Sequence, residues 1–231
     1  MTNTLLLPAP ERYRRSSGLG VLLMLALSAV ALLSAPLLLP EGYSWLTHTT
    51  SQAAAQGIQG AWLARLGFLA FGLAVIWLSS AVVGAWARGM VWLQLSFGVF
   101  MVATAAFSHR PWIDGVSFDP VEDALHSFTA TAMGFAFALG VLLRLFQRWN
   151  SDRLGRMLDV TALLFATVVP LVMLYQSDIA GLVQRLMFLV AYAWYAREAA
   201  MLYARAPAQP PPAVEADVDP PAATNGARRR R

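Results

Sequence analysis

Long stretches without a charged side chain dominate this sequence. Five of them are uncharged throughout: 16–40, 66–87, 89–108, 124–143 and 160–177. A sixth stretch, 179–203, is interrupted by Arg185 and Arg197. A helix needs about twenty mostly apolar residues to cross the roughly 30 Å hydrocarbon core of a membrane. Since only 13% of the residues are charged, the chain is predicted to be all-α, a polytopic membrane bundle of six transmembrane helices.

The first stretch follows a basic start, as a signal peptide does, but it is longer than the roughly 7–15 apolar residues of a signal peptide. We therefore expect a retained helix. The expected domains are a cytoplasmic N-terminal segment (1–15), a six-helix transmembrane domain (16–205) and a Pro- and Ala-rich cytoplasmic tail (206–231), disordered and ending in four arginines.

Arginine placement predicts the orientation of the bundle, because short cytoplasmic loops retain positive charge. All 17 basic residues are arginines. With both termini in the cytoplasm, only Arg65, Arg110 and Arg185 fall on the other side. The sequence thus predicts an N-in/C-in, multi-pass protein of the bacterial plasma (inner) membrane, with membrane lipids as partners. Because the basic residues form no single face, nucleic-acid binding is not expected.

Titratable side chains gather between the third and fourth stretches, in "SHRPWIDGVSFDPVEDALHSFTAT" at 108–131. The predicted topology places this segment at the extracytoplasmic mouth of the bundle. It places His48, in the first loop, on the same side. This mouth is therefore expected to collect the groups that could act as ligands, acids or bases.

The segment "DPVEDALH" predicts the start of a helix. Asp119 before Pro120 is typical of an N-cap followed by Pro at the first helical position, and Glu122 stands where a capping-box carboxylate belongs. Ser51 is expected to cap a short helix in the first loop. The same spacing puts Glu122 and His126 on one helical face, where a carboxylate can orient an imidazole.

The three histidines and two of the carboxylates suggest a divalent metal site. His48, His109, His126, Glu122 and Asp119 offer ligand types that zinc accepts. The sequence contains no HExxH spacing and no cysteine. Haem is a weaker alternative, because the opposite face has no histidine to hold a second haem.

Two classes of function are open at this point. In the first, the mouth is a metal or small-ligand site for lipid-directed hydrolysis, with His126 and Glu122 as the candidate catalytic groups. In the second, the protein is a non-catalytic module that binds lipid or a partner protein, or passes a proton or small solute, and the histidines are neutral hydrogen-bonding groups. The sequence does not decide whether the protein is an enzyme.

Two arginines at the same side are candidates for lipid or ion-pair contacts. Arg65 and Arg185 stand at the ends of the second and sixth stretches. Arg65 and Arg185 could pair with the carboxylates or hold a lipid phosphate through two parallel hydrogen bonds. The alternative is that both side chains only extend along the helix to reach water.

Three parts of the chain resemble a family of bacterial and archaeal membrane proteins, the domain of unknown function 998. They are "THTTSQAAAQGIQGAWLARLGFLAFGL", "FGVFMVATAAFSHRPW" and "DALHSFTATAMGFAFALGVL". The matching positions are Ser51, Gly67, Gly72, His126 and, more loosely, His109, and the resemblance covers residues 18–203. It implies a six-span bundle and names no activity.

Overall fold

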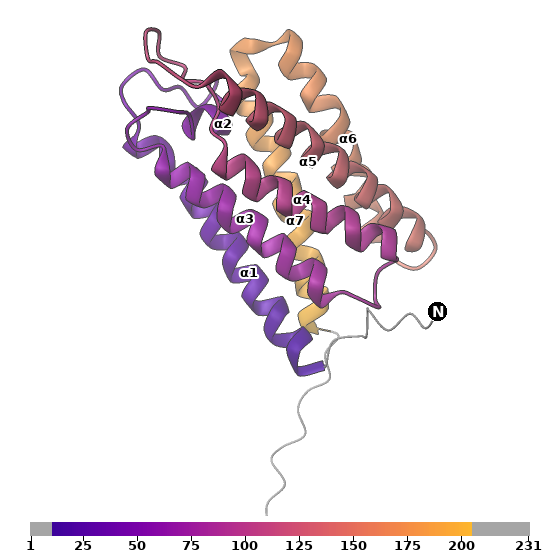
Figure 1. Cartoon of the computed structure of the whole chain (residues 1–231). Helices are drawn as coiled ribbons and strands as arrows, with labels where there is room; N and C mark the ends of the chain where they lie inside the picture. Colours follow the sequence, from indigo (N-terminus) through magenta and orange to yellow (C-terminus); the bar gives the residue numbers. More distant parts are fainter. Residues whose placement is uncertain (1–10, 205–231) are drawn as a thin grey trace, which may run out of the picture.

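The structure, a computed structural model, describes residues 11–204 as helices joined by loops, with no strand among them (Figure 1). The elements are α1 (Glu11–Ser34), η1 (Ala35–Leu38), α2 (Thr50–Ala53), α3 (Trp62–Ala81), α4 (Arg88–Ala106), α5 (Pro120–Gln147), α6 (Arg153–Tyr175), η2 (Ser177–Ile179) and α7 (Ala180–Ala204). Six of these helices are long and apolar enough to cross a membrane, which confirms the predicted spans. The predictions for residues 1–10 and 205–231 lie outside the described residues.

Several helices begin before the uncharged stretches that predicted them. α6 begins at Arg153 and not near residue 160, because the side chain of Asp152 caps it by accepting a hydrogen bond from the Gly155 amide at 2.8 Å. Hydrophobicity marks the part of a helix that lies in lipid, whereas the cap marks its end. Asp159, which the hydrophobic pattern placed outside the span, is therefore inside the helix.

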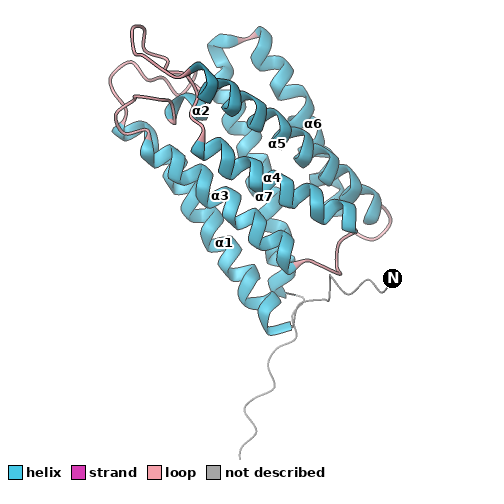
Figure 2. Ribbon diagram, viewed as in Figure 1, coloured by secondary structure: helices cyan, strands magenta, loops and turns pink. Residues whose placement is uncertain are grey.

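The six long helices form a closed ring in chain order. α1 packs against α3 and α7, and each of the following helices packs against the next one along the chain. The longer loops, which include α2, gather at one end of the bundle, here called the long-loop end (Figure 2). α1 begins and α7 ends at the other end, here called the terminal end (Figure 1).

Aromatic side chains fill the middle of the ring. Phe71 on α3 stacks on Tyr192 of α7 with ring centroids 4.3 Å apart. Tyr195 on α7 contacts the rings of Phe97 on α4 and Phe137 on α5. The interior is therefore a packed core, built from large side chains of four helices.

Two glycines that face each other mark a close approach between α3 and α4. A Cβ added to Gly72 would lie 2.8 Å from the carbonyl oxygen of Gly98, and one added to Gly98 would lie 2.8 Å from that of Gly72. Small residues at such crossings let two backbones pack against each other in a membrane.

A network of buried charges joins α5, α6 and α7 near the terminal end. Arg148, the C-cap of α5, binds both Asp159 of α6 and Glu198 of α7, and its Nε lies 2.6 Å from Asp159 Oδ2. Arg144 binds Glu198 at 2.8 Å, and the indole of Trp194 donates to Asp159 at 2.7 Å. Asp159 is 0% exposed and Glu198 3% exposed. These four ions balance in charge, as buried ions must if they are to be stable.

A second pair extends this network toward the loop between α5 and α6. Arg197 on α7 binds Asp152, the cap of α6. Burial raises the pKa of the Asp152 carboxyl, but the Gly155 amide and the Arg197 guanidinium outweigh it and hold this pKa below its usual value. The carboxylate form is thus the one that the fold stabilises.

Candidate functional site

The start of α5 follows the predicted cap only in part. The Asp119 side chain accepts a hydrogen bond from the Val121 amide at 2.8 Å and Pro120 opens the helix, as predicted. The predicted capping-box role of Glu122 is wrong. Its carboxylate accepts from the Ser108 amide at 2.6 Å, while the Asp119 amide donates to Gln56. Ser108 and Gln56, from two different loops, thus form the hydrogen bonds that Glu122 and the Asp119 amide would have formed with each other in a capping box.

The short helix α2 has a different cap from the expected one. Thr49, and not Ser51, is its N-cap, and the Gln52 side chain completes a capping box with it. Threonine and glutamine at this spacing satisfy two amides at once, whereas a cap at Ser51 would place Ala54 at the box position and so satisfy one.

Gln56, which follows α2, holds the loops of this end together. Its side-chain amide donates to the carbonyl oxygens of Ser108 at 2.8 Å and Asp119 at 3.1 Å, and accepts from the Asp119 amide at 2.7 Å. Its backbone amide donates to the His109 carbonyl at 2.9 Å. The side chain is buried, so Gln56 fixes the start of α5 and the end of the α4 segment to the first loop.

Gln56→Met is expected to lower the free energy of unfolding by about 1–2 kcal/mol, because the shape is kept while three backbone groups lose their partner. Thermal unfolding in detergent, followed by circular dichroism, measures the loss. Gln52→Met, which replaces a less buried glutamine, serves as the comparison. It should lower the free energy of unfolding by less than Gln56→Met does. Equal stability of Gln56→Met and the wild type would contradict the role given to Gln56.

His109 and His126 lie beside each other. Their ring centroids are 5.4 Å apart and nearly perpendicular. His126 Nδ1 lies 2.8 Å from the carbonyl oxygen of Phe107, the residue that ends α4, so this nitrogen must donate. Its Nε2 is buried and makes no hydrogen bond within residues 11–204. His109 Nδ1 is 3.9 Å from Asp123. This geometry fits a neutral His126 that ties α5 to α4.

His48 makes its ring contacts elsewhere. Its ring packs on Trp112 at 4.7 Å and on Tyr43 at 5.3 Å, and its Nδ1 accepts from the Ser44 amide at 2.9 Å. Burial and the nearby charge of Arg185 lower the pKa of His48. The ring is therefore neutral at pH 7 and is held within the first loop.

The two arginines that were singled out both bind backbone carbonyls. Arg185 donates to the carbonyl oxygens of Trp45 and His48 at 2.8 and 2.9 Å and to the hydroxyl of Tyr43 at 2.6 Å, so it anchors the first loop to α7. Arg65 donates to the Ala54 and Ala55 carbonyls at 3.0 and 2.9 Å. No carboxylate within residues 11–204 forms an ion pair with either.

The five predicted metal ligands do not meet at one point in the structure. Asp119 and Glu122 border a pocket, His109 and His126 pair beside it, and His48 packs on Trp112. Among the described histidines, aspartates and glutamates, no group of three is placed to hold a metal ion.

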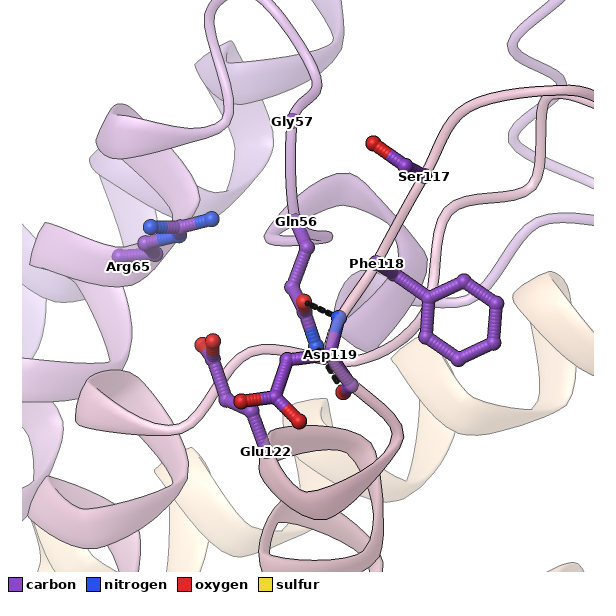
Figure 3. A pocket seen from close by; sticks show the side chains of 7 residues that line it. All are labelled: Gln56, Gly57, Arg65, Ser117, Phe118, Asp119 and Glu122. Atoms are coloured by element: carbon purple, nitrogen blue, oxygen red, sulfur yellow. Dashed lines mark hydrogen bonds between the residues drawn. The ribbon is translucent and has the colours of Figure 1, made fainter.

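The pocket at the long-loop end has a volume of about 460 Å³ (Figure 3). Its lining residues are Gln56, Gly57, Arg65, Ser117, Phe118, Asp119 and Glu122. Arg65 borders it from the start of α3, while Asp119 and Glu122 border it from the start of α5. Both signs of charge thus face one space without being paired, and none of the three histidines lines it.

Sequence reasoning missed two features of this molecule. Gln56 is one of several glutamines in the first loop, and nothing local distinguishes it. Asp159 and Glu198 were detectable, because an acidic residue next to or within a span is costly and needs a partner. Their partners lie on other helices, however, and the spacing along the chain does not indicate which ones.

Comparison with known proteins agrees with the resemblance seen in the sequence. No curated protein and no solved structure matches the chain. A family model described as protein of unknown function (DUF998) matches residues 20–200. This range covers α3, α4, α5 and α6 completely, α1 from residue 20 and α7 up to residue 200. The chain therefore belongs to the DUF998 family, as a multi-pass helical membrane protein.

Proposed function

We propose that this protein binds the headgroup of a membrane phospholipid in the pocket at the long-loop end. In this proposal the bundle lies N-in/C-in in the bacterial inner membrane, so the pocket opens at the extracytoplasmic surface. The function is one of binding and does not require a reaction, and Arg65 holds the phosphate.

The observation that carries the proposal is an arginine that lines the pocket, has no ion-pair partner among the described residues and lies one turn from an exposed tryptophan. Arg65 follows Trp62, which begins α3 and is 57% exposed. Exposed tryptophans mark the boundary between lipid and water, and Trp92 and Trp149 lie exposed at the other end of the bundle. Arg65 is one turn inside this boundary, but its side chain reaches back to the Ala54 and Ala55 carbonyls of the first loop. This reach supports a guanidinium at the depth of the phospholipid phosphates.

The pocket is also of a suitable size and rigidity. Its volume of about 460 Å³ is within the range of roughly 300–1,000 Å³ found for small-ligand sites. The two carbonyls that accept from Arg65 hold its guanidinium in place. A fixed arginine loses less conformational entropy on binding a phosphate than a free one does.

We expect Arg65→Gln to weaken phospholipid binding at least about tenfold, the effect of losing one charge-assisted hydrogen bond. The full chain is purified in detergent, titrated with dioleoyl phospholipids, and the bound fraction is measured by native mass spectrometry. Arg110→Gln is the matched control, because Arg110 is exposed at the same end and lies outside the pocket lining. Equal binding by the wild type and Arg65→Gln for every phospholipid would refute the proposal.

A further inference from the structure

The charges of the pocket indicate the chemical class of its ligand, on the assumption that the pocket binds a headgroup as proposed above. One arginine faces two carboxylates, so the lining is negative overall. Arg65 forms no ion pair with Asp119 or Glu122, nor with any other described acid. A ligand that carries only a phosphate would satisfy Arg65 and leave both carboxylates without a cation.

Each charged group has an atom free for a ligand. Arg65 uses Nε and Nη2 for the Ala54 and Ala55 carbonyls. Its Nη1 makes no hydrogen bond to the described residues, so it can donate to an anion. Glu122 Oε1 accepts from Ser108 and Asp119 Oδ1 accepts from Val121. The second oxygen of each carboxylate has no partner of this kind within the described chain and can accept from a cation.

We infer that the pocket takes a zwitterionic group in which a phosphate and a primary amine are joined by a short link, as in phosphoethanolamine. The phosphate binds Arg65, and the ammonium donates to Glu122 and Asp119. An ammonium has three donors and matches two separate carboxylate oxygens. A quaternary ammonium has no donor and is bound by a cage of aromatic rings, whereas Phe118 is the only aromatic residue in the described lining.

The surroundings of the pocket suit a lipid as the source of this group. Exposed apolar side chains flank the charged residues on both helices: Trp62 and Leu66 on α3, and Val121 and Leu125 on α5. Acyl chains of a phospholipid seated in the pocket would lie against these side chains. A soluble phosphoethanolamine would gain nothing from them.

The test compares phospholipids that share their acyl chains. The full chain in detergent is titrated by native mass spectrometry with dioleoyl phosphatidylethanolamine, phosphatidylglycerol and phosphatidylcholine. We expect phosphatidylethanolamine to bind at least tenfold more tightly than either of the others. In the double variant Asp119→Asn, Glu122→Gln this preference should disappear and phosphatidylglycerol should bind more tightly. Both substitutions keep the oxygen that bonds to the backbone, so the start of α5 stays formed.

The failure of this inference can be told from the failure of the proposed function. Equal affinity for phosphatidylethanolamine and phosphatidylglycerol would refute a zwitterionic ligand, and so would a preference that survives in the double variant. Neither result would contradict headgroup binding. Phosphatidylglycerol binding that requires added Mg²⁺ and is lost in EDTA would also refute a zwitterionic ligand, because the carboxylates would then hold a metal. Binding of soluble phosphoethanolamine without binding of any phospholipid would support a zwitterionic ligand and refute the proposal that this ligand is part of a phospholipid. If neither soluble phosphoethanolamine nor any phospholipid binds, both this inference and the proposed function are overturned.

Discussion

Asp159→Asn is expected to lower the free energy of unfolding by about 3–5 kcal/mol, the usual cost of removing one partner of a buried ion pair. Asp159 accepts from Arg148 and from the indole of Trp194. An asparagine of the same shape turns an N–H toward donors. It leaves the Arg148 charge with Glu198, which Arg144 already shares, and with Asp152 at the longer distance of 3.8 Å. Thermal or chemical unfolding in detergent measures the effect.

The matched control is Asp178→Asn, which removes an exposed aspartate from η2 and should cost less than about 0.5 kcal/mol. A double-mutant cycle with Arg148→Gln separates the pair from its surroundings. Once Arg148 is neutral, Asp159→Asn should cost clearly less than it does in the wild type. Equal costs in the two backgrounds would show that Arg148 and Asp159 are not coupled.

Gly72→Val is expected to cost about 3 kcal/mol, at the upper end for overpacking a well-packed core. The new Cβ would lie 2.8 Å from the Gly98 carbonyl oxygen and 2.9 Å from the Val102 amide nitrogen. Both are backbone atoms, so no side chain can rotate away and α3 must separate from α4. The same unfolding measurement applies.

Gly134→Val is the control for this second prediction. Gly134 lies within α5, and a Cβ added there would meet nothing within 4 Å. Valine has a helix propensity better than that of glycine by only roughly a few tenths of a kcal/mol, so this variant should be as stable as the wild type or slightly more so. Similar losses for the two variants would mean that Gly72 does not mark a close helix contact.

The parts of the fold that follow from neighbouring residues could be predicted. Five uncharged stretches and a sixth interrupted by Arg185 and Arg197 located the six spans, because crossing a membrane depends on length and composition. Asp119 before Pro120 located the start of α5, because a cap acts on the amides directly after it. The cap of α2 was predicted at Ser51, but Thr49 is the cap, because Gln52 completes a capping box with Thr49.

The parts that depend on contacts between distant segments could not be predicted. Glu122 was assigned to its own helix end, yet its partner is the Ser108 amide across a loop. Arg65 was known to lie at a helix end, but its isolation from the carboxylates depends on the Ala54 and Ala55 carbonyls. The pocket exists because Gln56 joins three segments, and no periodicity in the sequence encodes such a junction.

The buried charge network also sets an order for assembly of the protein in the membrane. During synthesis α5 and α6 emerge first. Arg148 then has Asp152 and Asp159 as partners, but the positive charge of Arg144 has no acidic partner among the described residues before α7. Glu198, which arrives on α7, cancels it. The last helix is therefore needed to make the preceding two stable within lipid. A chain truncated before α7 would expose the unpaired charge of Arg144 and become a target for the proteases that remove misassembled membrane proteins.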